Sequence, residues 1–90
     1  MSRKQISEQI VEIVSRAAGR PRGEITLQSD LLQDVELTSL EIILMLGEIE
    51  SAFQVRLPVE ELYEVTLVEE LVNCVEAQLA ARPSDGQSNS

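Results

Sequence analysis

The spacing of the apolar residues restricts the fold of this chain more than any other feature of the sequence. Three segments repeat apolar side chains every three or four positions, which is the period of an α-helix with one buried face. The segments run from Arg3 to Ala17, from Ser39 to Phe53 and from Thr66 to Leu79. No segment alternates strongly enough to predict a β-strand. The chain is therefore expected to be all-α.

Turn-forming residues separate these segments. Gly19 and Pro21 end the first helix, and Pro58 breaks the chain before a short helix at about residues 60–64. Thr66 is expected to cap the last helix with Glu69 as its capping-box partner. The long connection over residues 18–38 contains large apolar residues, so it should be pinned onto the helices, with one short turn near residues 30–33. These elements predict a small four-helix bundle, with three longer helices and one short helix.

The length of ninety residues allows one domain with a modest core. Residues 82–90 contain no apolar side chain, so we expect a domain over residues 1–81 and a disordered C-terminal tail over residues 82–90. Such a domain is too small for both a core and a deep enclosed active site, which favours a binding or carrier module over an enzyme. Met1 and the tail favour a free-standing protein, and we expect a monomer.

The charge is unevenly distributed along the chain. The net charge is −9. The first 23 residues are basic overall, whereas residues 24–79 contain Arg56 as their one basic residue among many acids. Such a surface repels nucleic acids and anionic membranes and attracts basic patches on protein partners. Because no apolar run approaches the length of a signal core or a membrane span, we expect a cytoplasmic protein that does not insert into membranes.

Several kinds of chemistry are excluded by composition. The chain has no histidine and one cysteine, Cys74. It therefore lacks a Ser–His pair and an internal disulfide, and it lacks the sets of histidines and cysteines that zinc, haem and iron–sulfur sites typically use. Cys74 falls within a helical apolar pattern and is expected to be a small core residue. We predict no catalytic residues and no metal site.

Ser39 stands where a polar stretch becomes the second helix. Thr38 is positioned to be the N-cap, and Glu41 completes a capping box three residues later. Ser39 then lies in the first turn, at the positive end of the helix, and points outward because this turn is not yet packed. Without a histidine to activate it, this hydroxyl is suited to modification by another enzyme.

The second helix contains more apolar residues than one face can bury. If Met45 and Phe53 face the core, Leu40 and Leu44 lie on another face together with Glu41. An exposed pair of leucines flanked by acids is typical of a partner-docking surface. The alternative is a helix that is buried on most sides.

An ordered set of short motifs resembles the acyl carrier protein family. The resemblance extends from about Gln5 to Leu79. The family's Asp-Ser-Leu signature corresponds here to Thr38-Ser39-Leu40. The motifs around it occur in the family's order: Glu24-Ile25-Thr26, Leu31-Leu32-Gln33-Asp34-Val35, Phe53, Leu57-Pro58, Glu60-Glu61 and Thr66-Leu67-Val68.

The resemblance implies that Ser39 receives a 4′-phosphopantetheine arm from coenzyme A through a separate, magnesium-dependent phosphopantetheinyl transferase. The thiol of the arm would hold acyl intermediates as thioesters in fatty-acid, polyketide or other specialised acyl biosynthesis. The chain itself would catalyse nothing.

The expected partners are the transferase, an acyl-loading enzyme, and a ketosynthase or other acyltransferases with basic docking patches. The residues expected to recognise these partners are Thr38, Leu40, Glu41, Leu44, Glu48, Glu60 and Glu61. An acyl chain would retreat into a cleft, and the residues expected to line it, with ordinary core as the alternative, are Ile43, Leu46, Ile49, Leu62, Leu67 and Val72.

The sequence departs from the family pattern around the serine. Thr38 replaces the usual Asp, and Glu36 replaces a usual Gly. Leu44 stands where the family commonly has Glu, and Gly47 stands where a larger residue is common. The docking helix is thus less acidic than usual, which favours a specialised carrier for polyketide, nonribosomal peptide or modified-lipid assembly. Two alternatives remain, a peptidyl or aminoacyl carrier and an unmodified acidic adaptor that binds a basic protein. Gly47 costs about 1 kcal/mol relative to alanine, and we expect a close approach by a partner or a neighbouring helix to explain it.

Overall fold

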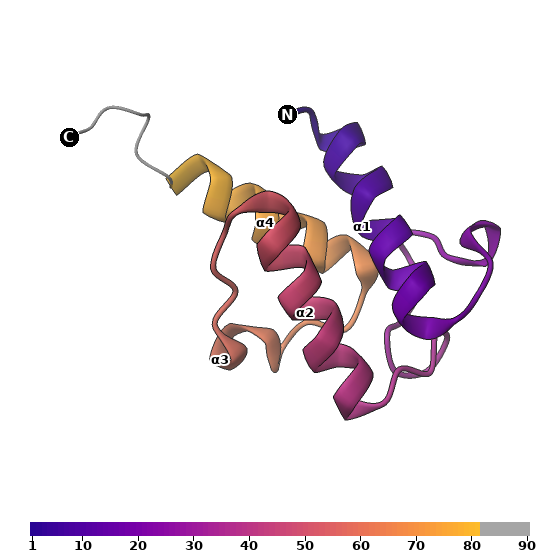
Figure 1. Ribbon diagram of the computed structural model, residues 1–90. Coiled ribbons are helices and arrows are strands. Elements are labelled where there is room, and N and C mark those ends of the chain that lie inside the picture. Colours follow the sequence, from indigo (N-terminus) through magenta and orange to yellow (C-terminus); the bar gives the residue numbers. More distant parts are fainter. Residues whose placement is uncertain (82–90) are drawn as a thin grey trace.

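The computed structural model describes residues 1–81, except for the side chains of Val59 and Glu61. The tail expected over residues 82–90 lies outside this part of the chain. The elements are α1 (Arg3–Ala18), a 3₁₀ turn η1 (Arg22–Glu24), α2 (Ser39–Phe53), α3 (Val59–Leu62) and α4 (Val68–Ala81). The predicted all-α bundle of three longer helices and one short helix is confirmed. Helix α1 packs against both α2 and α4 (Figure 1).

The boundaries of the first two long helices follow from local caps. Ser2 forms a capping box with Gln5 at the start of α1, and Gly19 ends that helix in the left-handed conformation, with φ of 66°. Thr38 caps α2, and Gln54 ends it, also in the left-handed region. Because these signals depend on residues a few positions apart, both helices lie where the sequence predicts them.

One hydrophobic core joins the three long helices. Its fully buried members include Ile10 and Val14 from α1, Met45 and Ile49 from α2, and Leu71 from α4. No helix of the described residues is both long enough and apolar enough to cross a bilayer.

The long connection between α1 and α2 is pinned onto this core, as predicted. Its buried apolar side chains are Ile25, Leu31, Val35 and Leu37. The Leu31 N–H donates to the Thr66 carbonyl at 2.8 Å, and the Val68 N–H donates to the Ser29 carbonyl at 3.0 Å. The predicted turn is confirmed as well, because an Asp30 carboxylate oxygen accepts from the N–H groups of the two residues at positions 32 and 33. These bonds fasten the connection to the start of α4.

The capping partner of Thr66 differs from the prediction. The carboxylate of Glu70, not that of Glu69, accepts from the backbone N–H groups of Thr66 at 2.6 Å and Leu67 at 3.0 Å. The Glu69 N–H donates instead to the Leu27 carbonyl at 2.9 Å. The prediction was wrong because the pinned connection occupies this N–H and α4 begins only at Val68, so the reciprocal carboxylate lies one residue later.

Glu70 therefore gives the fold a pH dependence. The hydrogen bonds from the Thr66 and Leu67 backbones hold the pKa of its carboxyl below the usual 4.5, against a smaller opposing effect of desolvation. A carboxyl whose pKa is lower in the folded state stabilises the fold above its unfolded pKa, and this contribution is lost as the pH falls through the folded pKa.

We expect Glu70→Ala to lower the free energy of unfolding at pH 7, because two N–H groups at the start of α4 lose their acceptor. The difference from wild type should shrink as the pH falls below 4.5. Urea unfolding over this pH range checks the prediction. Glu64→Ala, which removes an exposed carboxylate with no hydrogen bond in the described residues, is the control. A deficit that stays constant with pH would contradict the role of the ionised carboxylate.

Candidate functional site

Ser39 is the first residue of α2 and is exposed. In Figure 1 this end of the helix is the lower one, where the connection from α1 arrives. Within residues 1–81 the Ser39 hydroxyl makes no hydrogen bond, and the backbone N–H groups of Ser39 and Leu40 have no acceptor. The first N–H groups of a helix point along its axis and carry the positive end of its dipole. The hydroxyl is thus accessible, and an anion attached to it would lie beside free donors.

A short rigid segment holds Ser39 in this position. The Glu41 N–H donates to Thr38 Oγ1 at 3.2 Å, and the Thr38 N–H donates to Glu41 Oε1 at 2.9 Å. The predicted capping box is confirmed. Leu37, immediately before the cap, is buried, and its N–H donates to the Leu31 carbonyl at 3.0 Å. The pinned connection therefore fixes the start of α2 and the direction in which Ser39 faces.

Glu36 is held in a conformation that favours glycine. Its φ is 64°, in the left-handed region. The Arg20 side chain spans this point, because Nε donates to the Val35 carbonyl at 3.2 Å and Nη2 donates to Glu36 Oε1 at 2.9 Å. Sequence reasoning missed Arg20 as a supporting residue. The only signal was Glu36 itself, a charged residue at a position where the resembled family usually has glycine.

An apolar stripe follows Ser39 along α2. We define it as Leu40, Ile43 and Leu44, whose exposed fractions are 65%, 62% and 63%. Spacings of three and four place these side chains on one helical face. The expectation that Leu40 and Leu44 lie outside the core is confirmed. Ile43 belongs to the same surface, although the sequence suggested only a cleft position for it.

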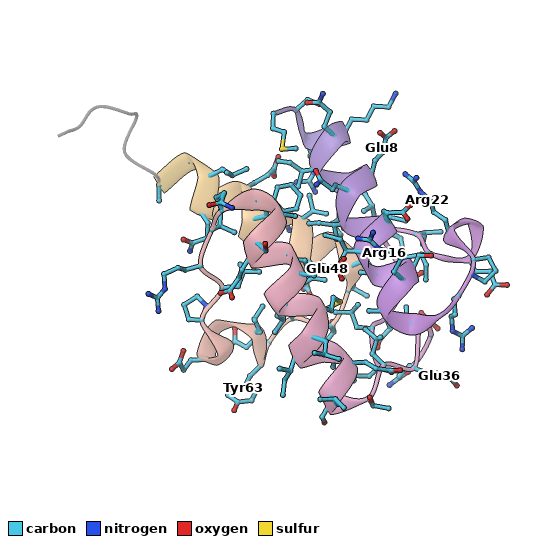
Figure 2. The ribbon with its side chains drawn as sticks, in the orientation of Figure 1. Glu8, Arg16, Arg22, Glu36, Glu48 and Tyr63 are labelled. Carbon is cyan, nitrogen blue, oxygen red and sulfur yellow. The ribbon has the colours of Figure 1, made fainter. Side chains whose placement is uncertain are left out.

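Two of the acidic residues near the stripe are paired within the chain. Glu41 is held in the capping box, and Glu48 pairs with Arg16 of α1 at 2.5 Å. Figure 2 shows Arg16 and Glu48 next to each other between α1 and α2. Glu60 is exposed, whereas Glu61 lies in α3 with its side chain outside the described part. Two of the four glutamates expected to recognise partners are therefore already paired.

A groove of about 490 Å³ lies beside the stripe, between α2 and residues 56–60. Of the residues expected to line an acyl cleft, it brings together Ile43 and Leu46. Ile49 and Val72 are fully buried core residues, and Leu62 and Leu67 are partly buried outside the groove lining. The groove lining is Ile43, Leu46, Gly47, Glu50, Arg56, Leu57, Pro58 and Glu60.

Gly47 is not explained by packing inside the bundle. A Cβ added at this position would meet no described atom within 4 Å. The expectation of a neighbouring helix in close approach is therefore wrong. Among the described residues there is also no group of three or more carboxylate or cysteine side chains that could hold a metal ion.

Comparison with known proteins identifies the family to which this chain belongs. A model described as a phosphopantetheine attachment site matches residues 8–75. The acyl carrier protein of Rubrobacter xylanophilus is 35% identical over 83% of this chain and 93% of its own length. Those of Thermobifida fusca and Coprothermobacter proteolyticus are 25% and 28% identical, over 83% and 88% of this chain and 95% and 96% of their own lengths. The chain therefore belongs to the acyl carrier protein family, whose members are carriers rather than catalysts and hold acyl groups on a covalently attached 4′-phosphopantetheine.

Proposed function

We propose that Ser39 is the residue to which the 4′-phosphopantetheine arm is attached. The observation that carries this proposal is an exposed hydroxyl that makes no hydrogen bond to any described residue, at the first position of a 15-residue helix. The free N–H groups of Ser39 and Leu40 suit the phosphodiester that attachment would create, because they donate towards a negative charge at this end of the helix.

The reaction needs an enzyme from outside the chain. Ser39 Oγ would attack the β-phosphorus of coenzyme A, forming a new P–O bond as the bond to 3′,5′-ADP breaks. The hydroxyl proton would pass to a base on the transferase, since this chain has no histidine to accept it. Once attached, the arm supplies a thiol that binds acyl groups as thioesters. The chain thus acts as a substrate of other enzymes and catalyses no step itself. We propose that the protein is cytoplasmic.

The apolar stripe is the surface that we propose for partner recognition. An enzyme that acts at Ser39 must approach the start of α2, and the stripe begins at the next residue. Because Glu41 and Glu48 are paired within the chain, the close contact should be mainly apolar, with the net charge of −9 acting in long-range steering. Standard interfaces involve about 20–30 residues a side, so this small stripe suits a transient encounter and a monomeric carrier.

The intact mass of the protein tests the attachment. We expect incubation with coenzyme A, magnesium and a broad-specificity phosphopantetheinyl transferase to add the mass of one phosphopantetheine, and peptide mapping to place it at Ser39. No gain with several transferases would instead favour the unmodified acidic adaptor.

The weakly acidic docking face also supports a dedicated carrier in polyketide, nonribosomal peptide or modified-lipid assembly, which includes a peptidyl or aminoacyl carrier. We expect the holo protein to replace a general fatty-acid carrier poorly in a reconstituted fatty-acid synthase, measured as the rate of chain elongation. Full replacement at equal concentration would contradict the specialised role, whatever the result of the mass measurement.

A further inference from the structure

A strained turn at Glu36 interrupts the anchored segment that leads into α2. Its neighbours Val35 and Leu37 are both buried. Their N–H groups donate to two carbonyls of residues 30–31, at 2.9 Å and 3.0 Å. Glu36 itself has a φ of 64°, which a residue with a Cβ seldom adopts. Because this turn lies three residues before Ser39, the direction in which the chain enters α2 depends on it.

The side chain of Arg20 holds this turn at two points. Its Nε donates to the Val35 carbonyl at 3.2 Å, and its Nη2 donates to Glu36 Oε1 at 2.9 Å. The guanidinium is planar and rigid, so both contacts are made by one group in a fixed geometry. Its Nη1 also lies 3.6 Å from Glu24 Oε1. Arg20 therefore binds both the residue with the unfavourable φ and the carbonyl directly before it.

The backbone of Arg20 is in turn fixed to the end of α1. The Arg20 N–H donates to the Ser15 carbonyl at 3.1 Å, and Ser15 Oγ donates to the Arg20 carbonyl at 2.5 Å. Ser15 is buried, and Gly19 ends α1 directly before Arg20. The guanidinium thus extends from a fixed point on the bundle. Through it, the end of α1 is connected to the turn that precedes Ser39.

Loss of these contacts should act locally. Exposed ion pairs contribute little to the overall stability of a fold, and the Glu36 side chain is 68% exposed. Without Arg20, conformations in which Glu36 leaves the left-handed region would compete with the one described, because they relieve its steric penalty. In those conformations the start of α2 would be displaced, and only the remaining fraction of molecules would present Ser39 correctly.

We infer that Arg20 is a positioning residue for the modification of Ser39, because it holds the turn at Glu36 and thereby keeps the start of α2 in one orientation. The inference rests on the proposed attachment at Ser39. When an enzyme binds only the ordered form of its partner, the apparent affinity falls in proportion to the population of that form. Loss of Arg20 should therefore raise the KM of the transferase for the carrier and leave kcat nearly unchanged.

The test separates backbone geometry from charge. Arg20→Ala removes both contacts. Adding Glu36→Gly supplies a residue that adopts a positive φ without steric penalty, whereas adding Glu36→Ala removes the same charge but keeps the penalty of a Cβ. Arg22→Ala is the matched control, because it loses the same charge and an ion pair with Glu12 at 3.3 Å. Figure 2 shows Arg22 well apart from Glu36.

Two measurements on the full chain report the role of Arg20, with urea unfolding as a check of the fold. Hydrogen exchange of the Leu37 N–H reports local opening without any enzyme, and the kinetics of phosphopantetheine transfer report KM and kcat. We expect Arg20→Ala to raise both the exchange rate and KM by roughly 5- to 10-fold. Adding Glu36→Gly should return both to within about twofold of wild type. Adding Glu36→Ala should not, and Arg22→Ala should match wild type.

The possible outcomes distinguish this inference from the proposed function. An unchanged KM in Arg20→Ala, whatever its effect on unfolding, would overturn the inference and leave attachment at Ser39 intact. A raised KM that Glu36→Gly does not reverse would mean that Arg20 contacts the transferase directly. Equal rescue by Glu36→Ala would mean that charge balance matters and not the turn, and either result would overturn the inference. Wild type that gains no mass with several transferases would reject the proposed function and the role of Arg20 together.

Discussion

Replacing Ser39 by alanine is expected to abolish modification by the transferase completely. No other residue can take over, because the reaction requires a hydroxyl at the exposed start of α2, and Thr38 uses its hydroxyl to accept from the Glu41 N–H. The fold should hardly change, since the Ser39 side chain is exposed and makes no hydrogen bond within residues 1–81. Exposed substitutions of this kind alter the free energy of unfolding by about 0.5 kcal/mol or less.

Two measurements separate a lost attachment site from a damaged protein. Intact mass after incubation with coenzyme A reports the modification, and urea unfolding reports the fold. Ser51→Ala is the matched control, because Ser51 is another exposed serine of α2. This variant should gain one phosphopantetheine at the wild-type rate. A mass gain that persists in Ser39→Ala would place the arm on a different residue and refute the assignment.

The positions of the helices could be predicted because their determinants are local. The period of the apolar residues identifies the buried faces, and a capping box such as that of Thr38 and Glu41 involves residues only three apart. The exposed position of Ser39 at the start of α2 followed from the same local signals, whereas its chemical role is a proposal that the resemblance implies. The start of α4 was predicted less well, because the Glu69 N–H is taken by the Leu27 carbonyl, a residue far away in the sequence.

The electrostatics of the candidate site could not be predicted, for a related reason. Glu48 looks like a free docking acid in the sequence, but it pairs with Arg16, 32 residues earlier. No periodicity relates two such positions. The groove could not be predicted either, because apolar spacing cannot distinguish a core residue that also lines the groove, such as Leu46, from one that lies only in the core, such as Ile49. Both face inward, and only the packing of the residues after α2 separates them.

The double substitution Leu40→Ala and Leu44→Ala is expected to lower kcat/KM for modification of Ser39 by roughly 10- to 100-fold. Both leucines are more than half exposed and lie within two turns of Ser39, so we expect an enzyme that acts on this hydroxyl to contact them. Truncating an interface residue to alanine costs more than about 1 kcal/mol at a minority of positions, and these lie near the centre of the interface. The fold should not weaken, because neither side chain belongs to the core. Leu32→Ala is the matched control, since Leu32 is also exposed, at 58%, but lies outside the stripe.

Salt dependence distinguishes this apolar docking from ionic docking. Attraction between exposed charges is screened as the ionic strength rises from about 0.05 M to about 0.5 M, whereas apolar contact is not. Because Glu41 and Glu48 are held by Thr38 and Arg16, the loss caused by the double substitution should be similar at both salt concentrations. The rate of modification of the wild-type protein should fall with rising salt only to the extent that long-range electrostatic attraction accelerates the encounter. If salt removed most of the wild-type rate while the double variant matched wild type at low salt, ion pairs would dominate the encounter and the stripe would have no role in it.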